Sequence, residues 1–110
     1  AKTDEVLISL DHFKGVIEAN EATAQCTVQA GTRLYELGEY LAPFNQALIN
    51  QGEIDQQSLA GAISTGTHGT GIDLPGLSAF VQGFELLTAD GDLLQCDEQQ
   101  NTEIFQAGRV

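Results

Sequence analysis

The chain has 110 residues, of which 42% are hydrophobic, and its 16 acidic residues outnumber four basic ones to give a net charge of -12. This length predicts one hydrophobic core and therefore one domain. The acidic excess excludes nucleic acid as a default partner, because affinity for its phosphates depends on lysine and arginine. No apolar run approaches the roughly 20 residues that span a bilayer, so we expect no membrane segment.

The N-terminal part of the chain predicts strands. The apolar run at residues 6–10 is typical of a short strand. Two further runs, at residues 15–19 and 24–30, flank a polar pair and together predict a hairpin. Alternation in the second run places Cys26 on its apolar face, which we expect to be buried.

A change of periodicity after Gly31 predicts a helix. Thr32 offers a hydroxyl as N-cap, and leucines then recur at three- and four-residue intervals. The helix should end near Pro43. The apolar face of this helix would carry Leu34, Leu37, Tyr40, Leu41 and Phe44, and we expect the three leucines to be core.

The C-terminal part predicts a second hairpin and a last helix. Apolar and β-branched residues at 80–88 and 93–96 flank the pair Asp90-Gly91, which is a strong hairpin signal. A short helix beginning near Asn101 or Thr102 would carry Ile104 and Phe105. The elements together predict an α+β fold of antiparallel β-hairpins flanked by two or three helices.

The cysteines and the paired aspartates give no metal signal. Cys26 and Cys96 lack the spacing of a metal site, and their apolar surroundings favour reduced, buried thiols. A disulfide bond is the alternative, and it would require an oxidising compartment. Asp90 and Asp92 lack the alternating oxygens of an EF-hand loop, so we interpret them as turn residues.

Residues 51–76 are rich in glycine, serine and threonine, and this segment is where function is expected. Its glycines let the backbone approach a ligand closely, while N–H and hydroxyl groups supply donors for an anion. No lysine or arginine lies between Arg33 and Arg109. A phosphate bound here would therefore depend on amides, hydroxyls and a helix N-terminus.

Two familiar phosphate motifs do not fit this segment. Residues 61–66 have the glycine spacing of a P-loop, but Thr67 and His68 stand where lysine and a hydroxyl residue should follow. Residues 66–71 read G-x-x-G-x-G, which reverses the dinucleotide fingerprint and lacks its βαβ context.

The segment instead resembles a loop of a known flavoprotein family. Residues 57–71, Gln-Ser-Leu-Ala-Gly-Ala-Ile-Ser-Thr-Gly-Thr-His-Gly-Thr-Gly, are similar to the second FAD-contacting loop of vanillyl-alcohol oxidase (PCMH) type flavoproteins. The nearest branch is that of the aldonolactone and alditol oxidases, which includes D-arabinono-1,4-lactone oxidase and L-gulonolactone oxidase. Residues 7–11, 28–38, 50–55 and 83–91 also resemble consecutive parts of that domain, in order.

The resemblance implies FAD as the cofactor and a set of contacts along it. Five of the implied residues would follow the pyrophosphate: Ser58, Gly61, Ala62, Ile63 and Ser64. The others would continue toward the ribityl chain and the flavin ring: Gly66, Thr67, His68, Gly69 and Thr70.

Neither histidine is expected to act in catalysis. The resemblance implies flavin contact or loop support for His68, because the family's covalently attached histidine belongs to a preceding segment. His12 follows a short apolar run and is interpreted as a surface turn residue.

The resemblance also implies that residues 1–110 are an interior part of an enzyme, the second subdomain of a PCMH-type FAD-binding domain. The first subdomain and the substrate-binding cap domain would lie outside the chain, so no catalytic residue is expected within it. The whole protein would be an oxidoreductase that oxidises a hydroxyl of a sugar lactone or polyol and passes electrons to oxygen or another acceptor. We expect it to be cytoplasmic.

The sequence also supports expectations for the isolated chain, and it leaves an alternative to the flavoenzyme hypothesis. The isolated chain should be inactive, bind FAD weakly and associate with itself through uncovered strand edges. The alternative is a non-enzymatic acidic α+β binding module whose Gly/Thr loop is only a flexible surface loop. Flavin content of the whole protein separates the two hypotheses.

Overall fold

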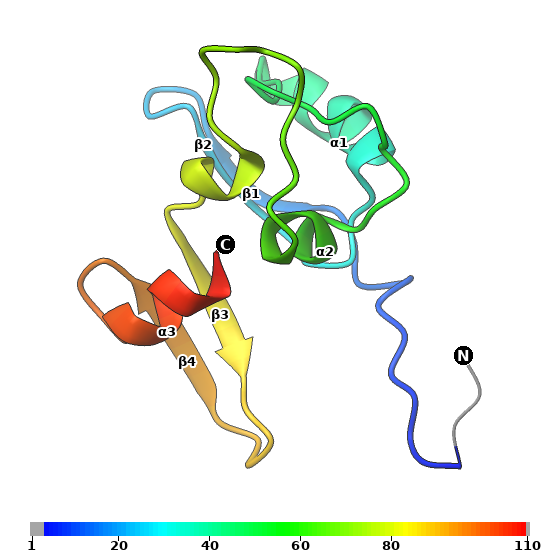
Figure 1. Cartoon of the computed structure of the whole chain (residues 1–110), viewed down its shortest axis with the longest axis vertical. Helices are drawn as coiled ribbons and strands as arrows, with labels where there is room; N and C mark the ends of the chain where they lie inside the picture. Colours follow the sequence, from blue (N-terminus) through cyan, green and yellow to red (C-terminus); the bar gives the residue numbers. More distant parts are fainter. Residues whose placement is uncertain (1–3, 110) are drawn as a thin grey trace. The chain divides into compact units, whose positions relative to one another are not determined.

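A computed structural model describes residues 4–109 and shows an α+β arrangement of two antiparallel hairpins and three α-helices, as predicted (Figure 1). The elements in chain order are β1 (Val16–Asn20), β2 (Gln25–Val28), α1 (Leu34–Leu41), α2 (Leu59–Ser64), β3 (Gly83–Leu87), β4 (Leu93–Asp97) and α3 (Thr102–Gly108). Two short 3-10 helices, η1 (Ala42–Phe44) and η2 (Leu77–Phe80), join them.

The chain divides into two compact units. The first comprises the residues up to Ile49 together with Asp55–Ala60, and the second comprises Asn50–Ile54 and the residues from Gly61 onward. Each unit has buried apolar side chains of its own, whereas the length alone predicts one core. The chain crosses between the units within residues 49–61, so each unit is built from two stretches of sequence.

The first hairpin forms where the sequence predicts it. β1 pairs with β2 in antiparallel register, with Ala19 opposite Cys26 and an irregularity between Val16 and Glu18. The expected burial of its apolar face is wrong for Cys26, which is a free and exposed thiol. Alternation specifies which side chains share a face, but not whether another element covers that face.

The strand predicted at residues 6–10 is absent from the structure, so that prediction is wrong. These residues form no ladder, and Val6, Leu7 and Ile8 are 88%, 68% and 79% exposed. The segment ends in a turn in which the Phe13 N–H donates to the Leu10 carbonyl at 2.9 Å. A strand needs a pairing partner, and an apolar run alone does not supply one.

Helix α1 buries the predicted leucines, since Leu34, Leu37 and Leu41 are all at most 2% exposed, but Phe44 of the same predicted face is 38% exposed. The helix tightens into η1 at its C-terminal end, where Pro43 lies in the first turn of the 3-10 helix. Asn45 then adopts a left-handed conformation with φ of 55° and ends the helical stretch. The expected termination near Pro43 is confirmed.

The N-cap of α1 is Arg33, so the prediction of Thr32 is wrong by one residue. The Glu36 carboxylate accepts the Arg33 backbone N–H at 3.2 Å, as in the second half of a capping box. The Thr32 hydroxyl is engaged elsewhere: it accepts the Gly15 N–H at 2.9 Å and donates to the Gln29 carbonyl at 2.7 Å. Thr32 therefore joins the start of β1 to the end of β2.

The second hairpin and α3 confirm the remaining predictions. β3 and β4 pair without a bulge, with Phe84 opposite Cys96, and Gly91 supplies a φ of 87° in the connecting turn. Phe105 of α3 is fully buried, and its ring centroid lies 5.9 Å from that of Phe84. Cys96 is fully buried and free, as expected.

Candidate cofactor site

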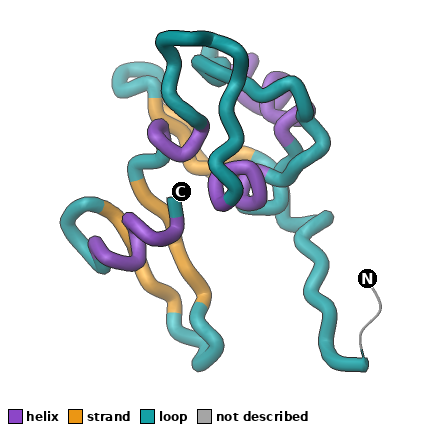
Figure 2. Tube along the Cα trace, in the orientation of Figure 1, coloured by secondary structure: helices purple, strands orange, loops and turns teal. Residues whose placement is uncertain are grey.

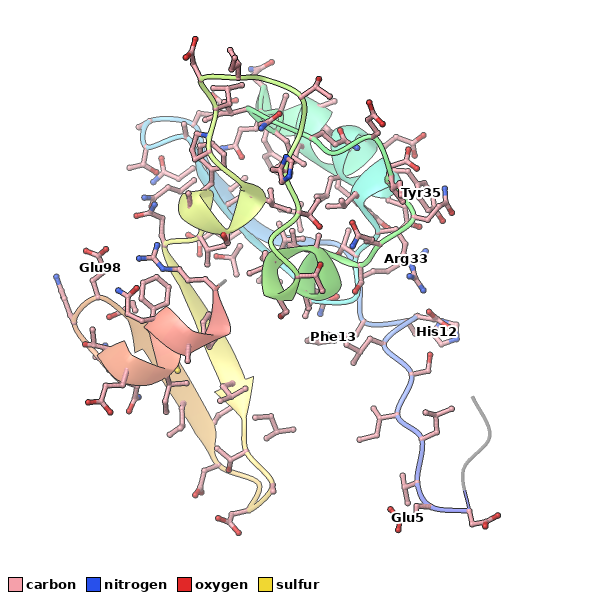
Figure 3. All side chains as sticks on the ribbon, in the orientation of Figure 1. Glu5, His12, Phe13, Arg33, Tyr35 and Glu98 are labelled. Atoms are coloured by element: carbon pink, nitrogen blue, oxygen red, sulfur yellow. The ribbon has the colours of Figure 1, made fainter. Side chains whose placement is uncertain are left out.

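The approach to the predicted loop is fixed by backbone hydrogen bonds within the first unit. Residues 55–60 run beside residues 30–35, and Ser58 forms an antiparallel bridge with Arg33. The Leu34 N–H donates to the Gln57 carbonyl at 3.0 Å, and the Tyr35 N–H donates to the Asp55 carbonyl at 3.0 Å. Figure 3 shows Arg33 and Tyr35 at the start of α1.

The Arg33 side chain strengthens the same junction. Its guanidinium donates to the Gln56 carbonyl at 3.1 Å and to the Asp11 carboxylate at 2.8 Å. A hydrogen bond from Ser9 and the adjacent Arg33 charge hold the pKa of Asp11 below its ordinary value. Arg33 thereby ties the N-terminal segment to the residues that lead into α2.

The N-terminus of α2 is not open in the way the sequence suggests. The Leu59 N–H donates to the Thr32 carbonyl at 2.8 Å, and the Ala60 N–H donates to the Ala30 carbonyl at 3.1 Å. An anion site at a helix N-terminus depends on amides without an intrahelical partner. Here the first two amides of the helix bind protein carbonyls, so the proposed contribution of this helix end is reduced.

Gly66 ends α2 by adopting the left-handed conformation, with φ of 64°. The Thr67 N–H donates back to the Ala62 carbonyl at 3.2 Å, and the Thr65 hydroxyl donates to the Gly61 carbonyl at 2.8 Å. A glycine just after the last helical turn is the usual solution for this geometry. The local fold therefore requires Gly66 whether or not a ligand is bound.

We call residues 66–71 the glycine loop. The long loop that contains them connects α2 to η2 (Figure 2). The ends of this longer loop are joined by the Leu77 N–H, which donates to the Thr67 carbonyl at 2.9 Å. Its middle turns through a bond from the Leu74 N–H to the Gly71 carbonyl at 3.1 Å. Backbone contacts thus define the loop without regular secondary structure.

Close packing explains Gly69. A Cβ added there would collide with the Asn50 Oδ1 atom, and it would lie 2.7 Å from the Gln51 carbonyl oxygen. Gly52 packs in a similar way, since its Cβ would lie 3.1 Å from Thr67 Cγ2. The segment before the loop therefore lies directly against it.

A shallow hollow of about 740 Å³ opens along the glycine loop within the second unit. Four of the predicted cofactor residues line it: Gly66, His68, Gly69 and Thr70. Sequence reasoning missed the rest of the lining, which is Gly71, Ile72, Leu74, Gly76 and Ser78. Only Gly71 carried a signal, because it belongs to the same glycine-rich motif.

The other predicted residues lie outside this hollow. Ser58 belongs to the first unit, Gly61 to Ser64 lie in α2, and Thr67 lies at the base of the loop. Ala62 is fully buried, so its side chain contributes packing and cannot reach a ligand. Any contact from Ala62 to a cofactor would have to use its backbone.

His68 is exposed and braces its own loop. Its Nδ1 atom lies 3.1 Å from the Gly69 carbonyl oxygen. A carbonyl oxygen can only accept, so Nδ1 is the donor in this contact. The geometry is that of a loop support contributed by a residue that also lines the hollow.

The donors of the hollow fit a phosphate held without a salt bridge. Thr70, Ser78 and His68 line it together with glycine backbone, and none of the lining residues is lysine or arginine. Arg109 is the basic residue of the second unit, and it is engaged: it lies 4.3 Å from the Phe105 ring centroid and 3.8 Å from the Glu98 carboxylate. Amides and hydroxyls can bind an anion in this way.

Comparisons with known proteins identify the class to which this loop belongs. A family described as FAD binding domain matches residues 1–97. A putative D-arabinono-1,4-lactone oxidase of Neurospora crassa is 38% identical over 98% of this chain and 19% of its own length. An L-gulono-1,4-lactone dehydrogenase of Mycobacterium tuberculosis is 40% identical, and an L-gulonolactone oxidase of Bos taurus is 38% identical, each over 100% of this chain and 25% of its own length.

The chain belongs to the FAD binding domain family, and FAD is the cofactor of that family. The resemblance seen in the sequence is confirmed, including the similarity to lactone oxidases. The chain spans 19% to 25% of the length of the curated relatives named above. Within residues 4–109, no helix has the length and apolar character needed to cross a bilayer.

Proposed function

We propose that this chain forms part of the FAD site of an oxidoreductase that oxidises a hydroxyl-bearing carbon of a sugar-derived lactone or polyol. The observation that carries the proposal is the family match over residues 1–97, which includes the whole glycine loop. The relatives named as lactone oxidases and dehydrogenases support the substrate class. When bound, FAD supplies the hydride acceptor for such a reaction.

In this proposal the chain's own residues bind and orient the cofactor. Ser58, Gly61, Ala62, Ile63 and Ser64 would follow the pyrophosphate, with Ala62 using only its backbone. The glycine loop would continue along the cofactor through Gly66, Thr67, His68, Gly69 and Thr70. The uncharged donors suit a pyrophosphate on a chain with a net charge of -12, because local amides and hydroxyls can oppose the general repulsion.

The hydride-donating carbon and the proton acceptor would be positioned by residues outside this chain. We propose a preceding subdomain and a following substrate-binding domain for that role, with residues 1–110 as the second subdomain. The relatives' names include both oxidases and a dehydrogenase, so both oxygen and another acceptor are candidates for the electrons. We also propose a cytoplasmic location and self-association of the isolated chain.

Flavin content and turnover of the protein encoded by the full gene test the proposal. The purified protein should be yellow, with one flavin per protein released on denaturation. Aldonolactones and alditols should give hydrogen peroxide, or reduce a dye when oxygen is a poor acceptor. A colourless protein that takes up no FAD would contradict the proposal and favour a binding module without enzymatic activity.

A further inference from the structure

We propose that Asn50 is a positioning residue that holds the glycine loop in its cofactor-binding shape; this inference rests on the proposed function. Asn50 is only 9% exposed and is one of few buried polar side chains among the described residues. Buried amide groups are costly unless they are hydrogen bonded, so a side chain of this kind is retained where it makes a specific contact. Asn50 makes one hydrogen bond, to Pro75, and one close packing contact, with Gly69.

The first contact is with the arm that enters the loop. The Asn50 Oδ1 atom occupies the space beside Gly69 where any other residue would carry its Cβ. Gly69 lines the hollow, together with the adjacent His68 and Thr70. Asn50 therefore packs against the part of the loop that the proposed function assigns to the cofactor.

The second contact is with the arm that leaves the loop. The Asn50 Nδ2 group donates to the Pro75 carbonyl at 3.3 Å. Between the two contact points the chain turns through the bond from the Leu74 N–H to the Gly71 carbonyl. One amide side chain thus contacts both arms of an irregular loop.

Such a link would act on binding through preorganisation. A loop without regular secondary structure loses backbone freedom when it closes on a ligand, and that loss weakens binding. Holding the arms together before FAD arrives removes part of the loss. Asn50 does not need to touch the cofactor for this effect.

Two substitutions distinguish the hydrogen bond of Asn50 from the space that its side chain fills. Asn50→Leu has nearly the same size but cannot donate to Pro75. Asn50→Asp keeps the shape, and its ionised carboxylate would face the Pro75 carbonyl with two acceptors. Gln82→Glu is the matched control, because it makes the same amide-to-carboxylate change at an exposed position of the second unit.

The measurements are the dissociation constant of FAD for the flavin-free, full-length protein and the melting temperature of that flavin-free protein. We expect both Asn50 variants to weaken FAD binding by about tenfold or more at pH 8, which corresponds to one buried hydrogen bond. Both Asn50 variants should still show a cooperative melting transition without flavin, and Gln82→Glu should match the wild type in both measurements.

A pH series adds a readout that a merely structural role would not move. Burial raises the pKa of a carboxyl at position 50, and the protonated form can donate to Pro75. The affinity of Asn50→Asp relative to the wild type should therefore recover by several-fold between pH 8 and pH 5, whereas that of Asn50→Leu should not. Three other ionisable groups lie on the same segments: Glu53, His68 and Asp73. Dividing the dissociation constant of each variant by that of the wild type at the same pH cancels their contribution.

The outcomes are distinguishable. A wild-type protein without FAD affinity overturns the proposed function. A wild-type protein that binds FAD while both Asn50 variants bind within twofold of it overturns the positioning role alone. If neither variant shows a melting transition without flavin, Asn50 is needed for folding itself and the positioning role is also overturned.

Discussion

The two hairpins are alike in sequence pattern and differ in what surrounds them. Each has a run of apolar residues with a cysteine on its apolar face. In β3–β4 that cysteine, Cys96, is fully buried beneath α3, while in β1–β2 the corresponding Cys26 is exposed. The local pattern therefore determines the hairpin, and a distant residue such as Phe105 determines whether its face is covered.

Exposed polar contacts surround the turn of the first hairpin. The Gln46 side-chain amide donates to the Asn20 carbonyl at 3.1 Å and to the Gln25 carbonyl at 3.3 Å. The Asn45 side chain adds a bond to the Glu21 carboxylate at 3.1 Å. Exposed polar contacts contribute little net stability, because water competes for the same groups. The second hairpin depends instead on buried apolar area.

Truncation of Phe105, which covers the second hairpin, should have the largest effect on the free energy of unfolding. Phe105→Ala removes a fully buried ring that packs against Phe84, so we expect it to lower the free energy of unfolding by about 3–5 kcal/mol. The matched change in the first hairpin, Ile17→Ala, removes a side chain that is 64% exposed and should cost at most about 0.5 kcal/mol. Urea unfolding of both variants measures the difference.

Equal losses of stability in these two variants would contradict the comparison. They would mean that the exposed face of β1–β2 is covered in solution, for example by a second copy of the chain. Unfolding at several protein concentrations would reveal such a partner, because association makes the midpoint depend on concentration.

Sequence reasoning succeeded where the signals are local. The turn at Gly91, the leucine stripe of α1 and the helix carrying Phe105 all follow from periodicity and turn chemistry within a few residues. It failed at residues 6–10 and at Cys26, where the outcome depends on a pairing or covering segment elsewhere in the chain. The division into two units depends on the same long-range information.

The candidate site shows the same limit. The glycine motif identified the loop, and Gly66, His68, Gly69 and Thr70 do line the hollow. The carbonyls that occupy the Leu59 and Ala60 amides could not be predicted, since they come from residues nearly 30 positions earlier. Nor could Asn50, whose importance appears only where its side chain meets Gly69 and Pro75.

Thiol reactivity should show the second largest contrast. Cys96 has no exposed surface, so a thiol reagent should modify it only when the chain unfolds. Cys26 should react in the folded chain, although partial burial raises the pKa of its thiol and keeps the reactive thiolate fraction low near neutral pH. Mass spectrometry of timed labelling would give the two rates. The rate at Cys26 should increase as the pH approaches its raised pKa.

The smallest expected effect concerns the ion pair between Lys14 and Glu36, which joins the segment before β1 to α1. Their charged groups lie 2.6 Å apart. A hydrogen bond from Lys14, followed by one from the Arg33 backbone, lowers the pKa of Glu36 from its ordinary value of 4.5. The hydrogen bond to Glu36 raises the pKa of Lys14 from 10.5. The pair therefore contributes stability between these two ordinary values.

Glu36→Gln should lower the melting temperature by a few degrees at most at pH 7, because exposed ion pairs contribute little. A carboxyl with a lowered pKa in the folded state gives stability above its unfolded pKa and loses it as the pH falls through the folded pKa. The difference from the wild type should thus stay constant between pH 6 and 8 and shrink below about pH 4.5. Glu39→Gln, the same change of charge at an exposed position of α1, is the control. If that control shifts the melting temperature equally, the shift comes from the change in net charge, since the chain is already strongly acidic. The Lys14–Glu36 pair would then not be one of the contacts that hold the first hairpin.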